Sequence, residues 1–237
     1  METVTFALTP HTCAIIVQRR RYVDAILHPM DTKAQLRSRV LARRDALPEE
    51  DRARKSATIC ARLEQHLRDA FATRARGGAS EAAAPAVAVF ASMRSEVDTQ
   101  AFVDAAYRRG WEVCFPCMVR EADGQPARMR FYRVTRTQLD AARARFLDTP
   151  LRCLACAALE ADGFAAVAAE DLDAVVVPLV AFDDDGNRLG YGGGNYDQLL
   201  PRLRADATVV GIAFDEQRVE TVPCEPHDIA LPHVVSG

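Results

Sequence analysis

The chain has 237 residues, of which 49% are hydrophobic and 27% are charged. This balance is typical of a globular protein with one domain or slightly more, and it excludes disorder over the whole length. No run of about 18 apolar residues occurs, so a membrane-spanning helix is not expected.

The formal charge of −3 conceals a gradient along the chain. Residues 1–76 hold 15 basic and 9 acidic side chains, whereas residues 77–237 hold 15 basic and 24 acidic ones. A cationic first third suits either nucleic acid or an anionic small molecule. Because no aromatic RNA-binding motif or zinc-finger helix occurs, we expect the small molecule and no nucleic-acid partner.

The first 29 residues differ from the rest. They place an apolar stretch before three arginines, which reverses the order of a signal peptide. We therefore expect no export and a cytoplasmic location. Met30 directly precedes a cleaner helical pattern, so residues 1–29 are interpreted as a dispensable extension and residues 30–237 as a single α/β domain.

Two helices are predicted at the start of this domain. Asp31 and Thr32 offer an N-cap, and apolar residues recur at helical spacing until the helix ends near Pro48. A second helix is expected over residues 49–71. The small residues that follow predict a flexible loop over residues 72–85.

Beyond this loop, apolar segments alternate with helical patterns. Residues 173–180 are nearly all apolar, which is typical of a central strand covered on both faces. The alternation predicts an α/β fold, a three-layer sandwich with a mostly parallel sheet flanked by helices. Strands are expected over residues 86–91, 111–118, 129–134, 173–180 and 209–214, and helices over residues 98–109 and 137–146.

The chain contains two C-x-x-C pairs. Cys114 and Cys117 form the first pair, and Cys153 and Cys156 form the second. Four thiolates at such spacings could hold a structural zinc ion. The alternative, which we favour, is that they are small buried apolar residues, because the first pair lies in an expected strand and neither pair has the glycines of a zinc knuckle.

A glycine-rich loop follows the central strand. Four of the 12 glycines fall within residues 190–194, where backbone N–H groups could converge on phosphate oxygens ahead of a helix expected from Tyr196. Arg188 could bind phosphate and Asp197 could bind magnesium. A plain tight connection is the alternative. The loop is neither a Walker loop nor a dinucleotide-binding fingerprint.

Several ordered segments together resemble the 5-formyltetrahydrofolate cyclo-ligase family, whose enzymes are also called 5,10-methenyltetrahydrofolate synthetases. The segments are K-A-Q-L-R from Lys33, S-E-V-D-T from Ser95, D-A-V-V-V-P-L-V-A-F-D-D-D-G-N-R-L-G-Y-G-G-G-N-Y-D-Q-L-L from Asp173, G-I-A-F-D-E-Q from Gly211, and V-P-C-E-P-H-D from Val222. The resemblance covers Lys33 to about Val235 and implies one catalytic domain.

The resemblance also implies a reaction. ATP and magnesium would drive phosphorylation of the formyl oxygen of 5-formyltetrahydrofolate, and the neighbouring amine would attack the activated carbon. ADP, phosphate and 5,10-methenyltetrahydrofolate would be released. Such chemistry needs charge neutralisation and positioning more than a protein nucleophile.

The resemblance assigns expected roles to individual residues. Lys33 and Arg188 would be catalytic, Glu96 and Tyr196 would contact the folate together with Gly192, Gly193 and Gly194, and Asp197 and Asp228 would bind magnesium. The residues expected to bind ATP are Lys33, Arg37, Arg188, Leu189, Gly190, Tyr191, Gly192, Gly193, Gly194, Asn195 and Tyr196. A monomer or small homo-oligomer is expected.

Two residues depart from the family's pattern. Asn195 stands where an aromatic residue is common, and Gln198 where arginine is common, which implies an altered folate pocket. Two other functions therefore remain open. One is a related ATP-dependent enzyme acting on another small acid, and the other is a non-catalytic module that binds zinc or a nucleotide.

Overall fold

The computed structural model of the chain describes residues 31–76, 84–121 and 125–237. The described chain is built around one eight-stranded sheet, with a separate two-stranded hairpin formed by β7 and β8. The strands are β1 (Ala86–Ala88), β2 (Glu112–Arg120), β3 (Arg128–Arg133), β4 (Leu154–Ala155), β5 (Ala165–Val167), β6 (Ala174–Pro178), β7 (Ala181–Phe182), β8 (Arg188–Leu189), β9 (Thr208–Ala213) and β10 (Val234–Ser236).

The large sheet has the order β10-β9-β6-β1-β2-β3-β5, and β4 pairs with β2 outside this path. The pairs from β10 to β2 are all parallel, and β4 is also parallel to β2. Antiparallel pairs of this sheet lie at one edge, where β3 pairs with β2 and β5 pairs with β3. The mostly parallel sheet predicted from the alternating pattern is confirmed.

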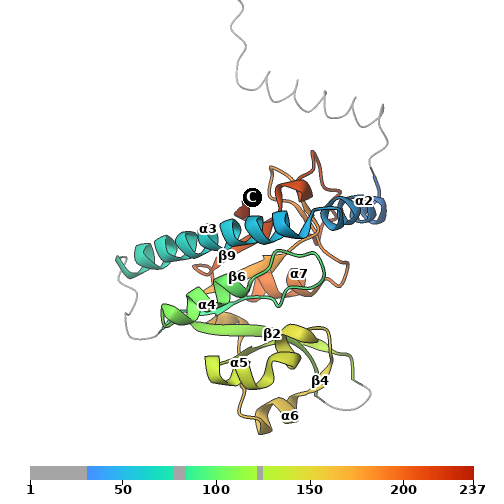
Figure 1. Cartoon of the computed structure of the whole chain (residues 1–237). Coiled ribbons are helices and arrows are strands. Elements are labelled where there is room, and N and C mark those ends of the chain that lie inside the picture. Colours follow the sequence, from blue (N-terminus) through green and yellow to red (C-terminus); the bar gives the residue numbers. More distant parts are fainter. Residues whose placement is uncertain (1–30, 77–83, 122–124) are drawn as a thin grey trace, which may run out of the picture.

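Helices cover the sheet (Figure 1). In Figure 1, α2 lies at one end of the molecule, and α5 and α6 lie at the other. The helices are α2 (Lys33–Asp45), α3 (Glu49–Arg76), α4 (Gln100–Arg108), α5 (Arg136–Arg143), α6 (Cys156–Ala161) and α7 (Asn195–Leu199), with a π-helical turn η1 (Ala144–Asp148) and the 3-10 turns η2 (Ala169–Asp171), η3 (Leu200–Arg202) and η4 (Asp215–Gln217).

Alternation along the strands divides the core into two layers. On β1, Val87 faces a cluster that contains residues of α3, α4, η1 and α6, whereas Ala86 and Ala88 face a second cluster that contains Leu199 of α7. Successive side chains on a strand point to opposite faces, so both faces of β1 are buried. This three-layer arrangement confirms the predicted α/β sandwich.

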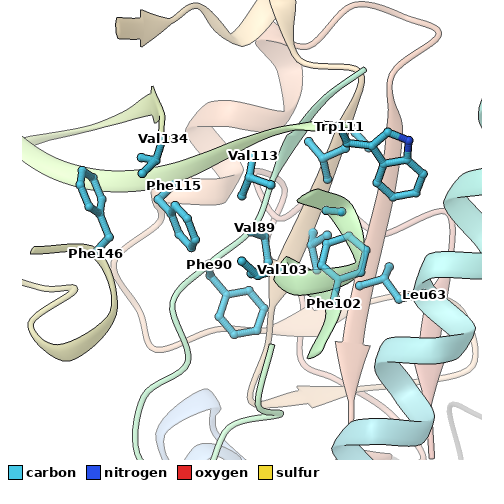
Figure 2. Packing of buried hydrophobic residues seen from close by; sticks show 14 of the residues in the cluster. Leu63, Val89, Phe90, Phe102, Val103, Trp111, Val113, Phe115, Val134 and Phe146 are labelled. Atoms are coloured by element: carbon cyan, nitrogen blue, oxygen red, sulfur yellow. The ribbon is translucent and has the colours of Figure 1, made fainter. Parts of the chain in front are cut away.

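The larger cluster is rich in aromatic side chains (Figure 2). Trp111 meets Phe71 of α3 edge to face, with ring centroids 5.2 Å apart, and lies 6.4 Å from Phe102 of α4. At the other end of the cluster, Phe115 of β2 lies 5.9 Å from Phe146 of η1. These contacts fix α3, α4 and η1 on one face of the sheet.

Helix α2 begins where the sequence predicts. Thr32 caps it: its hydroxyl accepts the Gln35 N–H, and the Gln35 side chain accepts the Thr32 N–H in return. Leu36 and Val40 pack on the β7–β8 hairpin. The cap therefore sets Lys33 as the first helical residue, beside the hairpin.

The structure corrects several predicted boundaries. Helix α3 continues to Arg76, so residues 72–76 are helical and do not belong to the loop expected over residues 72–85. The helix expected from Tyr196 is only the five-residue α7 followed by the turn η3. Strands β4, β5, β7, β8 and β10 were not predicted, and neither was helix α6; each of these strands has only two or three residues, and α6 has six. The proposed extension, residues 1–29, lies outside the described residues.

Candidate active site

A cavity of about 570 Å³ opens beside the carboxyl ends of β1 and β6. Pro178 is the last residue of β6, and Phe90 and Ala91 follow β1; all three line the cavity. Ligands of open α/β sheets commonly bind in this position. Every candidate residue lines the same cavity: Lys33, Arg37, Glu96, Arg188, Leu189, Gly190, Tyr191, Gly192, Gly193, Gly194, Asn195, Tyr196, Asp197 and Asp228.

Lys33 anchors one end of the cavity. Its Nζ lies 2.7 Å from Glu225 Oε2 and 2.5 Å from Asp228 Oδ2. Burial acts to lower the pKa of Lys33, but the bonds to Asp228 and Glu225 outweigh it and raise the pKa. Burial likewise acts to raise the pKa of Asp228, and the Lys33 ammonium more than reverses this. The site therefore holds a protonated lysine between two carboxylates.

The glycine loop is tied to α2 by Arg37. Its Nε donates to the carbonyl of Gly190 at 2.8 Å, and the spacing of four residues places Lys33 and Arg37 on one helix face. Gly192 has φ +100° and Gly194 has φ +64°, a left-handed backbone that other residues rarely adopt. The glycines are needed here because the chain turns sharply before α7. Since α7 has only five residues, its dipole adds less to anion binding than the sequence suggested.

Arg188 is fixed by two partners. Its side chain is only 5% exposed, and its Nη2 donates to Asp197 Oδ1 at 2.7 Å while Nη1 donates to the Ile229 carbonyl. Asp197 Oδ1 also accepts the Ile229 N–H at 3.4 Å. Arg188 and Asp197 thus reach the cavity as a bonded pair and not as two free groups.

The connection between β7 and β8 is organised by Asp183, which sequence reasoning did not single out. Its buried carboxylate accepts four hydrogen bonds, from the N–H groups of Asp185, Asn187 and Val222 and from the Asn187 side chain, at 3.0–3.1 Å. Asp is favoured in such turns because its side chain bonds the backbone that follows. Asp183 therefore sets the position of Arg188, which begins β8.

Glu96 supplies a buried carboxylate to the lining of the cavity. Its Oε2 accepts the Met93 N–H at 2.8 Å, whereas its Oε1 is buried and has no hydrogen-bond partner. Burial raises the pKa of Glu96, and the Met93 N–H, the Tyr191 hydroxyl and the charges of Arg44 and Arg94 oppose the rise. One oxygen of the Glu96 carboxylate is thus a buried acceptor without a hydrogen bond.

An apolar wall completes the cavity. It is formed by residues from separate parts of the chain, so no single motif marks it in the sequence. Leu151 is 69% exposed and Tyr191 is 40% exposed, which makes these two the exposed large apolar residues of the described chain. The apolar wall consists of Phe90, Met93, Pro116, Met118, Met129, Pro150, Leu151 and Pro178.

The two residues that depart from the family's pattern lie differently. Asn195 lines the cavity, and its Nδ2 lies 4.0 Å from Met118 Sδ. Gln198 is not among the lining residues, and its N–H bonds the Gly194 carbonyl within the first turn of α7. Asn195 is therefore the departure that affects the cavity surface.

The cysteine pairs do not converge on a metal site. Cys114 and Cys117 belong to opposite faces of the sheet, because three residues along a strand reverse the direction of a side chain. Within the described residues, the cluster able to hold a metal ion is Glu225, His227 and Asp228, whose ligand atoms lie within 4.8 Å of one another. Among all described helices, none has the length and hydrophobicity of a membrane span.

Comparison with known proteins gives a consistent result. The model of the 5-formyltetrahydrofolate cyclo-ligase family matches residues 29–237. The 5-formyltetrahydrofolate cyclo-ligase of Mycolicibacterium smegmatis is 27% identical over 207 residues, which cover 86% of this chain and 93% of that protein. The protein of that name from Escherichia coli (strain K12) is 34% identical over 151 residues, or 63% of this chain and 76% of the relative.

A solved structure agrees with the sequence relatives. The 5,10-methenyltetrahydrofolate synthetase of Aquifex aeolicus superposes with a TM-score of 0.61 at 27% identity, over 86% of this chain and 89% of that protein. The similarity therefore includes the fold as well as the sequence. Because the family model spans all of the described residues, the chain belongs to the 5-formyltetrahydrofolate cyclo-ligase family.

Proposed function

We propose that this chain uses ATP to convert 5-formyltetrahydrofolate into 5,10-methenyltetrahydrofolate, with release of ADP and phosphate. Family membership makes it an ATP-dependent ligase. The observation that carries the proposal is the cavity itself, where a basic, glycine-rich end meets an apolar wall with a buried carboxylate. Such a cavity suits a nucleotide phosphate chain beside an aromatic, partly polar second substrate.

The reaction balances without a protein nucleophile. The formyl oxygen attacks the terminal phosphorus of ATP, and ADP leaves. The neighbouring amine then attacks the activated carbon and loses its proton, and the carbon–oxygen bond breaks as phosphate departs. Both steps depend on holding the reacting groups in line and on stabilising negative charge at phosphate oxygens.

Lys33 and Arg188 supply that stabilisation. The raised pKa of Lys33 keeps it protonated at neutral pH, and Arg188 is held rigidly by Asp197 and the Ile229 carbonyl. A positioned cation costs little reorganisation when charge moves to the bridging oxygen. Arg37 and the residues 189–196 bind the remaining phosphate oxygens, where the left-handed glycines expose backbone N–H groups.

Magnesium is the metal that this reaction requires, and the residues present fit it. Asp228 and Glu225 offer carboxylate oxygens within 4.8 Å of each other, and Mg²⁺ prefers one or two carboxylates together with substrate phosphates. Asp197, which lines the same cavity, would add a further carboxylate. Bound there, magnesium would neutralise the phosphate chain, while Lys33 keeps its contact with Asp228.

The folate lies on the apolar wall. Its pterin ring carries N–H donors, and Glu96 Oε1 is a buried acceptor without a partner. Tyr196 borders the same space, and Gly192, Gly193 and Gly194 let the formyl group approach the phosphates closely. The comparisons favour this substrate over another small acid. A zinc module is not supported, because Cys114 lies on the other face of the sheet from Cys117 and Cys156.

We also propose that the enzyme works in the cytoplasm, as a monomer or small homo-oligomer, without a nucleic-acid partner. The basic residues of the first third support the absence of a nucleic-acid partner. Lys33 and Arg37 of α2 line the cavity, and Lys55 and Arg74 of α3 form ion pairs within the chain. Size-exclusion chromatography with light scattering gives the oligomeric state directly.

The activity is tested with purified protein, ATP, Mg²⁺ and 5-formyltetrahydrofolate. We expect the near-ultraviolet absorbance of the methenyl product to rise, with one ADP released for each product formed. Omitting ATP provides the blank. The absence of both turnover and folate binding in the presence of magnesium would contradict the proposed function.

A further inference from the structure

Arg44 of α2 is the most deeply buried cation near the cavity. The residue is 1% exposed, and its Nε donates to Ser95 Oγ at 3.0 Å while its Nη2 donates to the Tyr191 hydroxyl at 2.8 Å. Ser95 precedes Glu96, and Tyr191 belongs to the glycine loop. One guanidinium therefore joins the segment that carries Glu96 to the glycine loop.

Two oppositely charged side chains each have one polar atom without a hydrogen bond. Arg44 Nη1 and Glu96 Oε1 are both buried without a hydrogen bond. Both residues line the same small void, which is too narrow to hold a water molecule. A buried charge is costly unless an opposite charge compensates it. Because the unpaired donor of Arg44 and the unpaired acceptor of Glu96 border the same void, we infer that the charge of each side chain stabilises the other.

We propose that Arg44 is a positioning residue, which keeps Glu96 as a carboxylate and fixes the Tyr191 hydroxyl so that Glu96 can accept the N–H donors of the pterin ring. This inference rests on the proposed function. Arg44 does not line the cavity and acts through Glu96 and Tyr191. The nucleotide end, formed by Lys33 and Arg37 about three and two turns earlier on α2, does not depend on it.

The pH dependence follows from the groups that face Glu96. These are Arg44 from α2, Arg94 from the same loop, and the hydroxyls of Tyr191 and Tyr196. Burial raises the pKa of Glu96, and the positive charge of Arg44 counteracts it. Removing Arg44 raises that pKa further. Folate affinity, which needs the carboxylate, is then lost at a higher pH as the solution is acidified.

The experiment compares Arg44→Met with Arg44→Lys and with Arg39→Gln. Arg39 lies on the same helix in an exposed pair with Asp31, which makes its variant a matched control. For Arg44→Met we expect the KM for 5-formyltetrahydrofolate to rise by about tenfold, the size of one charge-assisted contact. The acidic limb of the folate profile should move to higher pH, and the affinity for an ATP analogue should stay within about twofold.

A second pair of variants tests whether Arg44 acts through Glu96. In a Glu96→Gln background, Arg44→Met should change neither the folate KM nor its pH profile further, because the carboxylate is already absent. Arg44→Lys, which keeps the charge, should recover part of the affinity. It also remains informative if Arg44→Met does not fold.

Two results would overturn the inference. One is an unchanged pH profile with only a lowered Tm, and the other is an equal loss of folate and ATP-analogue affinity, since both describe a purely structural arginine. Failure of the proposed function is a separate outcome, because it appears in the unaltered enzyme as the absence of folate binding and turnover.

Discussion

The two lysines of the chain have different surroundings. Lys33 lies in the cavity between Glu225 and Asp228, whereas Lys55 on α3 pairs with Glu216 at 2.9 Å and donates to the Gly237 carbonyl at 3.2 Å. Only the family motif distinguished Lys33 from Lys55 in the sequence, because a helical pattern alone does not show which residues meet a distant loop.

Replacing each lysine tests this difference. Lys33→Ala should weaken ATP binding by about 10- to 100-fold, because a hydrogen bond to a charged group contributes about 1.5–3 kcal/mol. Lys55→Ala should leave ATP affinity within about twofold and lower only the Tm. Titration calorimetry with an ATP analogue gives both values. Equal nucleotide affinities of the two variants would remove Lys33 from the site.

At the scale of elements, the β7–β8 hairpin presents Arg188 to the cavity. Its turn contains Gly186 at φ +82°, where an added Cβ would lie 2.3 Å from the Leu231 carbonyl oxygen. Asp183 holds the same turn through its four hydrogen bonds. The hairpin is therefore a rigid support for the glycine loop that follows it.

Asp183→Asn should destabilise this support. An amide nitrogen would face N–H donors, and we expect the free energy of unfolding to fall by about 2–4 kcal/mol, as for other buried polar networks. Asp184→Asn is the matched control, since Asp184 is 82% exposed and pairs with Arg218 on the surface. Urea unfolding measures both. A loss for Asp183→Asn no greater than for Asp184→Asn would show that the turn does not depend on this carboxylate.

Helices and strands were predicted from the sequence where a long apolar run or a clear capping residue marked them. The apolar run around β6 identified a buried parallel strand, and Thr32 identified the start of α2. In contrast, β4 and β10 have two and three residues, which is too short for a period of two to be visible. Such strands form because neighbouring strands supply their hydrogen bonds.

At the scale of the whole molecule, basic residues of the first third form ion pairs with acidic residues of the more acidic remainder of the chain. Cations of α3 pair with acidic groups of the second half: Lys55 with Glu216, and Arg74 with Asp173 and Asp206. The family motifs predicted most of the cavity, but its apolar wall and Arg44 were not predicted. These residues come together only when elements distant in the sequence pack against each other.

Acid stability provides a test of this packing. His66 of α3 stacks on His233, next to β10, with ring centroids 4.4 Å apart and planes 9° apart. Burial, reinforced by His233, lowers the pKa of His66, and Asp69 opposes the shift. A histidine with a lowered pKa binds its proton less readily when folded, so its destabilising effect grows as pH falls below its ordinary value of about 6.5.

The variant His66→Gln should therefore lose less stability than the wild type between neutral and mildly acidic pH. Urea unfolding at several pH values measures this, and the difference between the two proteins removes the contribution of all other titrating groups. If the free energy of unfolding of the two proteins changed with pH in the same way, the protonation of His66 would not be coupled to folding.

The central claim is that ATP phosphorylates the formyl oxygen within the cavity and that ring closure expels this oxygen as phosphate. The most direct measurement uses 5-formyltetrahydrofolate with a heavy oxygen isotope in the formyl group and follows methenyl absorbance together with the mass of the released phosphate. The account predicts one heavy oxygen in the phosphate for each methenyl product. Product formation with unlabelled phosphate, or no product at all, would contradict it.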